Sequence, residues 1–165
     1  MPSSEQPYWY ALKVFYRKAP QVQEDFRKAG HDTYLTPLID TLLFVHCTES
    51  TLRSYKERHE TALLYYTDPA AREKSKPGRI PDREMDIFRI ATSLAATDPD
   101  AMYLGSDTEK LCKGDRVRVT DGPYKGTEGY VKRVRHARKV LVAIKGVAVV
   151  ALSNIPLEFL EKIEG

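Results

Sequence analysis

Hydrophobic and polar positions in the first part of the chain follow the period of β-strands in four short stretches. Residues 8–16 are rich in aromatic and β-branched side chains, and residues 41–47 are almost continuously apolar. Such runs are typical of strands that are buried on at least one face. Two further strands are predicted at 33–37 and 62–66. The run at 41–47 is expected to be the central strand.

Three stretches between and after these strands have the period of helices instead. Val22, Phe26 and Ala29 recur at helical spacing and give one apolar stripe. Ser50 and Asp82 are candidate N-caps for a second and a third helix. The resulting order is strand, helix, strand, strand, helix, strand, helix, which predicts an α+β domain with helices packed on a sheet.

The chain after about residue 110 is predicted to form strands only. In residues 113–131, apolar and basic positions alternate, then Asp-Gly-Pro breaks the strand, and Gly126 and Gly129 permit a positive φ or a close backbone approach. Five short strands in this part predict a small five-stranded β-barrel, which removes exposed sheet edges by closure. The predicted organisation is therefore an N-terminal domain at 1–104, a linker at 105–110 and a barrel domain at 111–165.

The positive charge of the chain lies in its C-terminal part. The net charge of +3 divides into −1 for residues 1–104, with 14 Lys and Arg against 15 Asp and Glu, and +4 for residues 105–165, with 12 against 8. The densest basic run is 132–139. Such a patch favours a polyanion or an acidic protein surface, but a solvated hairpin tip explains the run equally well.

Two segments of the chain resemble one known family. Residues 113–131 resemble a KOW motif, the small barrel module of transcription elongation factors and of some ribosomal proteins. Trp-Tyr-Ala-Leu-Lys-Val-Phe at 9–15 and Leu-Phe-Val at 43–45 are similar to the N-terminal domain of NusG-type factors, and 80–85 resembles the lead into its last helix. The domain order agrees with this family, so the resemblance covers nearly the whole chain.

The resemblance implies a binding protein that works on RNA polymerase. Members of the family bind the coiled-coil clamp of the polymerase through an apolar surface of the N-terminal domain, and their barrel recruits a ribosomal protein or a termination factor. On this chain the polymerase contacts would be Phe15, Tyr16, Leu42, Phe44, Arg53 and Ser54. For Leu42 and Phe44 a place in the core is the competing interpretation, because apolar strand residues are usually core.

The barrel residues leave the second partner open. The candidate partner-binding or RNA-binding residues are Tyr124, Lys125, Thr127, Lys132, Arg133 and Arg135. Thr127 stands where the housekeeping factor tends to have a bulky aromatic residue, and the loop at 70–77 is idiosyncratic. These departures favour a specialised paralogue. The alternative function is an RNA- or ribosome-binding KOW module that does not bind polymerase.

No enzyme motif, cofactor motif or metal-ligand spacing is recognisable. None of the four histidines lies in a His-Glu-x-x-His pattern, and no Gly-rich loop precedes a helix. His46 and Cys47 are neighbours on a predicted strand and therefore point to opposite faces. No apolar run reaches the ~18 residues that a membrane helix needs. We therefore expect a cytoplasmic, monomeric protein without catalytic activity, cofactor, metal or membrane contact.

Overall fold

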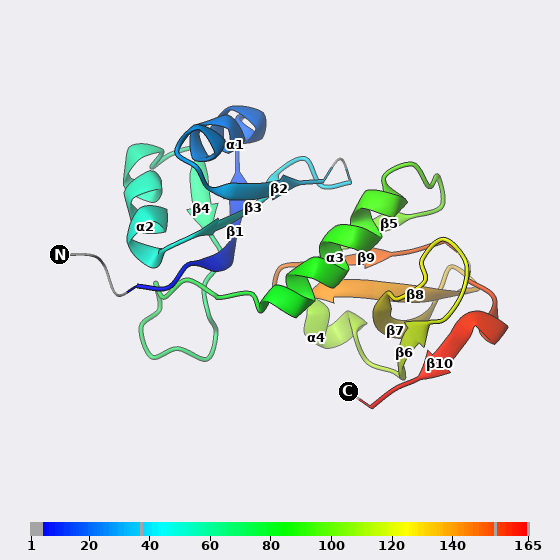
Figure 1. The fold of residues 1–165 in the computed structure, drawn as a ribbon. Coiled ribbons are helices and arrows are strands. Elements are labelled where there is room, and N and C mark those ends of the chain that lie inside the picture. Colours follow the sequence, from blue (N-terminus) through cyan, green and yellow to red (C-terminus); the bar gives the residue numbers. More distant parts are fainter. Residues whose placement is uncertain (1–4, 37, 154, 165) are drawn as a thin grey trace. The chain divides into compact units, whose positions relative to one another are not determined.

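The computed structural model describes residues 5–36, 38–153 and 155–164 of the chain. The chain divides into two compact units, Met1–Asp82 and Arg83–Gly165. Each unit contains one antiparallel sheet together with helices, so the predicted α+β class is confirmed (Figure 1). Within the described residues, no helix combines the length and the apolar character that crossing a membrane requires.

The first unit contains the six elements that the periodicity of its sequence predicts. Its sheet has the order β2-β3-β1-β4, and each neighbouring pair is antiparallel. Thr48 caps α2, because its hydroxyl accepts a hydrogen bond from the backbone N–H of Thr51, so the helix begins earlier than the predicted cap at Ser50. Pro37, at the end of the predicted strand 33–37, lies outside the described residues. The elements are β1 (Tyr8–Val14), α1 (Ala19–Lys28), β2 (Asp32–Leu35), β3 (Leu42–Cys47), α2 (Glu49–Arg58) and β4 (Leu63–Tyr65).

One face of this sheet forms the core with both helices. Leu12 of β1 lies opposite Leu43 of β3, and both belong to an apolar cluster that includes Phe26 of α1 and Leu52 of α2. The ring of Phe26 stacks on Tyr55 with centroids 3.8 Å apart. Val22 and Phe26 of the apolar stripe predicted for the first helix therefore face the sheet, whereas Ala29 follows the end of α1 and is exposed.

The opposite face of the same sheet is buried as well. Trp9, Leu42 and Phe44 are 6%, 2% and 0% exposed. Trp9 pairs with His46 across the strands, with ring centroids 5.4 Å apart. Because both of its faces are covered, β3 has the continuously apolar sequence that predicted a central strand.

The second unit begins with a helix and continues with a six-stranded sheet. The sheet order is β10-β6-β7-β8-β9-β5, and each neighbouring pair is antiparallel. Strands β6 to β10 correspond to the five strands predicted for this part. The elements are α3 (Asp82–Ala95), β5 (Met102–Gly105), α4 (Thr108–Leu111), β6 (Arg116–Val119), β7 (Glu128–Val134), β8 (Ala137–Ile144), β9 (Ala148–Ala151), the 3₁₀ helix η1 (Leu157–Phe159) and β10 (Leu160–Lys162).

The closed five-stranded barrel that the sequence predicted is not seen. The pairings among the described residues leave the sheet open, with β10 and β5 at its edges. The additional strand β5 lies at the end of the predicted domain 1–104, and Met102 and Leu104 pack against a buried cluster of Leu141, Val149 and Ala151. The predicted linker at 105–110 contains the end of β5 and most of α4. The predicted domain limits, 1–104 and 111–165, stay a prediction. The compact units of the structure divide after Asp82.

The glycine-rich turn between β6 and β7 agrees with the sequence prediction. The N–H of Gly126 donates to the carbonyl of Val119, and the N–H of Val119 donates to the carbonyl of Thr127, both at 2.8 Å. Gly126 has φ of 91°. A Cβ on Gly129 would lie 2.3 Å from the carbonyl oxygen of Leu141 on β8. One glycine therefore provides a left-handed turn, and the other lets two strands approach closely.

Candidate functional site

The turn between β1 and α1 exposes an aromatic side chain on a constrained backbone. Tyr16 is 74% exposed, and its ring centroid lies 6.3 Å from that of the half-buried Phe15. Tyr16 and Arg17 have φ of 58° and 56°, a left-handed conformation that is unfavourable for residues other than glycine. The N–H of Lys18 donates to the carbonyl of Phe15 across the turn at 3.2 Å, and the N–H of Phe15 donates to the carbonyl of Ala62 at 2.8 Å. Of the six residues that the resemblance implies as polymerase contacts, Tyr16 is an exposed aromatic one.

Leu42 and Phe44, the other two apolar candidates, are buried rather than exposed. Phe44 lies opposite Ala11 in the sheet, and its ring packs on Tyr34 with centroids 6.3 Å apart. Leu42 lies opposite Lys13. The structure therefore does not bring all four apolar candidates to one exposed surface.

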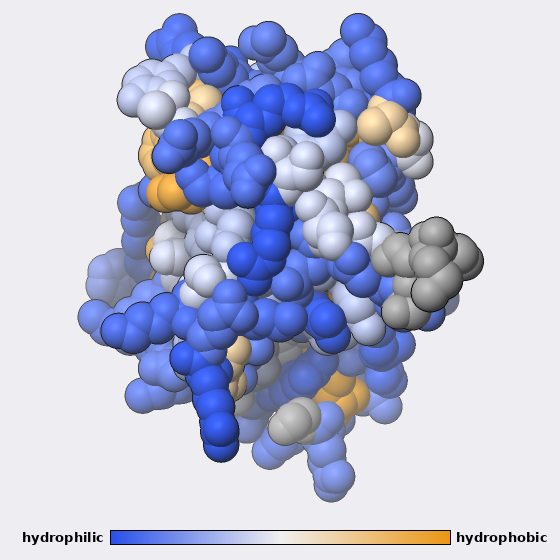
Figure 2. All heavy atoms as spheres, turned by 90° about the vertical axis from the view of Figure 1, so that its left-hand side faces the viewer, coloured by the Kyte–Doolittle hydropathy of each residue, from blue (hydrophilic) through white to orange (hydrophobic). Residues whose placement is uncertain are grey.

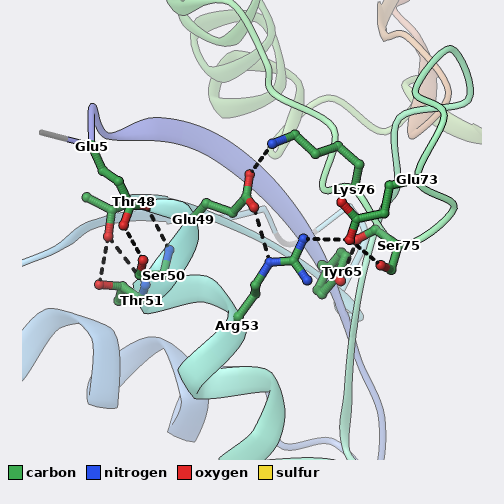
Figure 3. Close-up of polar contacts among 10 residues, drawn as sticks. All are labelled: Glu5, Thr48, Glu49, Ser50, Thr51, Arg53, Tyr65, Glu73, Ser75 and Lys76. Atoms are coloured by element: carbon green, nitrogen blue, oxygen red, sulfur yellow. Dashed lines mark hydrogen bonds and ion pairs between the residues drawn. The ribbon is translucent and has the colours of Figure 1, made fainter.

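Arg53, on α2, belongs to a network of charged residues that sequence reasoning missed (Figure 3). Its Nε donates to Oε2 of Glu49 at 3.1 Å, and one terminal nitrogen lies 3.3 Å from Oε1 of Glu73. The Nζ of Lys76 donates to Oε1 of Glu49 at 2.7 Å. Ser54, next to Arg53, is exposed. The network attaches the loop that follows β4 to the first turns of α2.

The network also changes the acidity of its two carboxyl groups. The hydrogen bond from Lys76, together with the one from Arg53, lowers the pKa of Glu49 against the opposing effect of burial. The hydrogen bond from the hydroxyl of Ser75 and the charge of Arg53 lower the pKa of Glu73.

The face of the molecule on which α2 lies is covered mainly by hydrophilic residues (Figure 2).

The spacing of Glu49 and Arg53 is the one sequence signal that could have revealed this network. A glutamate four residues before an arginine on a helix is a recognised ion-pair pattern. Lys76 and Glu73 come from a loop that has no periodicity, so their approach to α2 could not be read from the sequence.

Two of the three candidates in the β6–β7 turn are buried. Tyr124 is 6% exposed and donates its hydroxyl to Oδ2 of Asp98 at 2.8 Å. Burial and the hydrogen bond to Asp98 raise the pKa of Tyr124. Thr127 is 3% exposed, whereas Lys125 lies at the surface. Of this group, Lys125 alone is exposed.

The remaining basic candidates lie on the hairpin of β7 and β8. Arg133 and Arg135 are exposed and Lys132 is half-buried. The Nζ of Lys132 lies 3.4 Å from the carbonyl oxygen of Lys110. Arg135 and His136 form the two-residue turn between the strands, with φ of 50° and 69°. Lys132, Arg133 and Arg135 therefore lie together on one hairpin. Lys125 lies on a different turn, the one between β6 and β7.

A buried carboxylate on β7 organises a cluster of three arginines in the second unit. Glu128 forms ion pairs with Arg83 of α3 and with Arg116 and Arg118 of β6, the last two at 3.5 and 3.7 Å. Arg118 lies directly opposite Glu128 in the sheet. The cluster attaches the first turn of α3 to β6 and β7.

No group of three His, Cys, Asp or Glu side chains with the geometry of a metal site occurs among the residues that the structure describes. Burial raises the pKa of Cys47 to about 12, and it also raises the pKa of Cys112.

The comparisons with known proteins agree with this architecture at the level of the fold. No protein-family model matches the chain, and no curated protein matches its sequence. A solved structure of NusG from Thermotoga maritima, described as showing domain interaction, is similar with a TM-score of 0.51. The match has 19% sequence identity and covers 96% of this chain and 98% of that one. The chain therefore has a NusG-like fold.

Proposed function

We propose that this chain is a transcription elongation or antitermination factor that binds RNA polymerase through its N-terminal part. The observation that carries the proposal is the likeness to Thermotoga maritima NusG, which extends over 96% of this chain. The strand and turn motifs that resemble NusG-type factors lie in both halves of the chain, which supports the same function. Binding alone would provide the mechanism, because a factor shifts a polymerase conformation by its difference in affinity for two states.

The turn between β1 and α1 is the docking element in this proposal. Tyr16 is 74% exposed, and a tyrosine ring can pack on an apolar partner while its hydroxyl stays in water. The left-handed backbone at Tyr16 and Arg17 fixes the direction in which the ring points. Phe15 lies beside it and extends the apolar surface. Leu42 and Phe44 join the contact only if their face is uncovered.

Arg53 and Ser54 provide the second polymerase contact in this proposal. Ser54 is exposed, and the side chain of Arg53 is 37% exposed although it pairs with Glu49 and Glu73. The ion pairs hold the guanidinium in place before a partner arrives, which lowers the entropic cost of binding.

The C-terminal sheet recruits the second partner, a ribosomal protein or a termination factor, in the manner of a KOW module. Lys125 and the β7–β8 hairpin are the exposed candidates, whereas Tyr124 and Thr127 are buried. Because Thr127 stands where the family tends to have a bulky aromatic residue, we propose that this chain is a specialised paralogue. We also propose that it works in the cytoplasm as a monomer.

The experiment that tests this function is affinity capture with the full-length tagged chain in a lysate of its native host. We expect the subunits of RNA polymerase among the captured proteins and expect Tyr16→Ala to reduce their amount at least about fivefold. Lys28→Ala, at the end of α1 and away from this turn, is the matched surface control. Capture of ribosomes without polymerase would contradict the proposal and favour the RNA- or ribosome-binding alternative.

A further inference from the structure

A cavity of about 280 Å³ lies in the second unit, where α3, α4, β7 and β8 come together (Figure 1). Pockets that hold drug-sized ligands have about 300–1,000 Å³, so this cavity has room for a small metabolite. None of its lining residues is a candidate contact in the proposed function. They include Glu84, Glu109, Cys112, Tyr130, Ala143 and Lys145.

Two hydrogen bonds fix the walls of the cavity. The carboxylate of Glu84 on α3 accepts the backbone N–H of Lys145 at 2.9 Å. The hydroxyl oxygen of Thr108 on α4 accepts the N–H of Gly146, also at 2.9 Å. The turn between β8 and β9 is thus attached to both helices. A cavity whose walls are fixed before a ligand arrives binds it at a lower entropic cost.

A small side chain on β8 keeps the cavity open. Ala143 stands between Val142 and Ile144, and the other residues of the run 140–144 are all larger. Leu141, which faces the same side of the sheet, is fully buried. A larger apolar residue at position 143 would fill the space and bury more apolar surface, so packing alone does not explain the alanine.

Two opposite charges of the lining are not compensated by the chain. Glu109 and Lys145 are both exposed, and neither side chain forms an ion pair with the other or with any further residue that the structure describes. Much of the remaining wall is uncharged. It includes Ala143, the half-buried ring of Tyr130, and the thiol of Cys112, which stays neutral because burial raises its pKa.

We infer that this cavity binds a free amino acid or a similarly small zwitterion. The ammonium group of the ligand pairs with the carboxylate of Glu109, and its carboxylate pairs with the ammonium group of Lys145, in charge-assisted hydrogen bonds. The side chain of the ligand packs on the ring of Tyr130 and on Ala143. Such a ligand compensates both charges of the lining at once.

The surroundings favour a zwitterion over a simple cation or anion. Lys132 is close enough to act electrostatically on Cys112, and the guanidinium carbon of Arg116 lies 5.9 Å from the centre of the Tyr130 ring. A ligand with positive charge alone would therefore meet repulsion, and a ligand with negative charge alone would meet the two glutamates of the lining. The inference does not rest on the proposed polymerase contact, because it concerns other residues.

The test is a titration of the isotope-labelled full-length chain with each of the common L-amino acids in turn, up to millimolar concentrations, followed by the chemical shifts of the backbone amides. We expect at least one amino acid to shift the amides of Thr108, Ala143 and Lys145 in a saturable way. The analogues of that amino acid without the ammonium group and without the carboxylate, isocaproate and isoamylamine in the case of leucine, should bind at least about fivefold more weakly, because each loses one charged contact.

Variants of the lining locate the site. Glu109→Gln and Lys145→Gln remove one charge each and should weaken binding at least about fivefold, whereas Ala143→Leu fills the cavity without a change of charge and should remove binding. Glu158→Gln and Lys28→Gln, at exposed positions outside the cavity, are the matched controls and should bind like the unchanged chain.

Three results would overturn the inference. In the first, no amino acid shifts the three amides. In the second, an analogue with a single charge binds as tightly as the amino acid, or Glu109→Gln and Lys145→Gln keep the affinity of the unchanged chain. In the third, a folded Ala143→Leu variant binds normally, because the ligand would then lie elsewhere.

Discussion

Two glycines of the second unit illustrate how single residues determine the fold. Gly129 lies where a Cβ would meet the Leu141 carbonyl oxygen at 2.3 Å, whereas a Cβ on Gly126 would meet nothing within 4 Å. Gly129→Ala must push β7 away from β8, and we expect it to destabilise the protein by about 1–3 kcal/mol. Gly126→Ala introduces only the left-handed penalty, about 1 kcal/mol.

Urea unfolding of the two glycine variants and the unchanged chain measures this difference. A Gly129→Ala variant as stable as Gly126→Ala would contradict the close approach of β7 and β8.

Cys47 should be chemically inert in the folded protein. Its side chain is 1% exposed, and burial raises the pKa of its thiol to about 12, so at pH 8 only about one molecule in ten thousand carries the thiolate. We expect a Cys112→Ser variant, in which Cys47 is the remaining cysteine, to react with a thiol reagent only when urea unfolds the first unit. Rapid labelling without urea would contradict the burial of β3.

The sequence predicts some residue environments well and others not at all. Tyr16 was placed at the end of the predicted strand 8–16 and chosen as a contact residue because a tyrosine can keep its hydroxyl in water, and it lies exposed in the turn after β1. The burial of Tyr124 could not be predicted, because its hydroxyl partner Asp98 lies 26 residues earlier in the chain. Such distant pairings leave no local pattern.

The loop after β4 is expected to detach from α2 in acid. The pKa of Glu49 is lowered by Lys76 first and Arg53 second. Its contribution to stability is therefore complete above the ordinary pKa of glutamate, 4.5 in an unperturbed group, and is lost as the pH falls through the lower pKa of the folded state.

Glu49→Gln should lower the stability at pH 7 by about 0.5–1 kcal/mol, a value reduced because Arg53 and Lys76 are partly exposed to solvent. The difference between the variant and the unchanged chain should shrink as the pH falls below 4.5, the ordinary pKa of glutamate. Thermal unfolding from pH 3 to 7 measures it, with Glu57→Gln on the exposed side of α2 as a control. A difference that stays constant over this range would contradict the role of Glu49.

Most elements were predicted from their apolar patterns, and the two that were missed are β5 and α4. The strands of the first unit and helix α1 have apolar patterns long enough to define their type. Strand β5 has only Met102 and Leu104 to indicate a buried face, and its partner β9 lies more than 40 residues further along the chain. The prediction therefore placed a domain end and a linker where the structure has an edge strand and α4.

At the scale of the whole molecule, local sequence patterns predicted the class of each unit, and the family resemblance predicted the fold. Periodicity predicted an α+β unit followed by a strand-rich one, and the resemblance predicted the NusG-like fold that the structural likeness supports. The prediction of a closed barrel did not hold, because β5 and β10 lie at the two edges of an open sheet. Closure depends on how strands that are distant in the sequence pair, and local patterns do not show this. The candidate site residues stay predictions. Those that the structure exposes are Tyr16, Ser54, Lys125, Arg133 and Arg135.

The measurement that tests the central claim most directly is a binding titration of the full-length chain against the clamp coiled coil of the polymerase of its host. The account predicts saturable binding that Tyr16→Ala weakens about tenfold or more, whereas Lys28→Ala leaves it unchanged. Absence of binding by the folded, unchanged chain, or equal binding by the Tyr16→Ala variant, would contradict it.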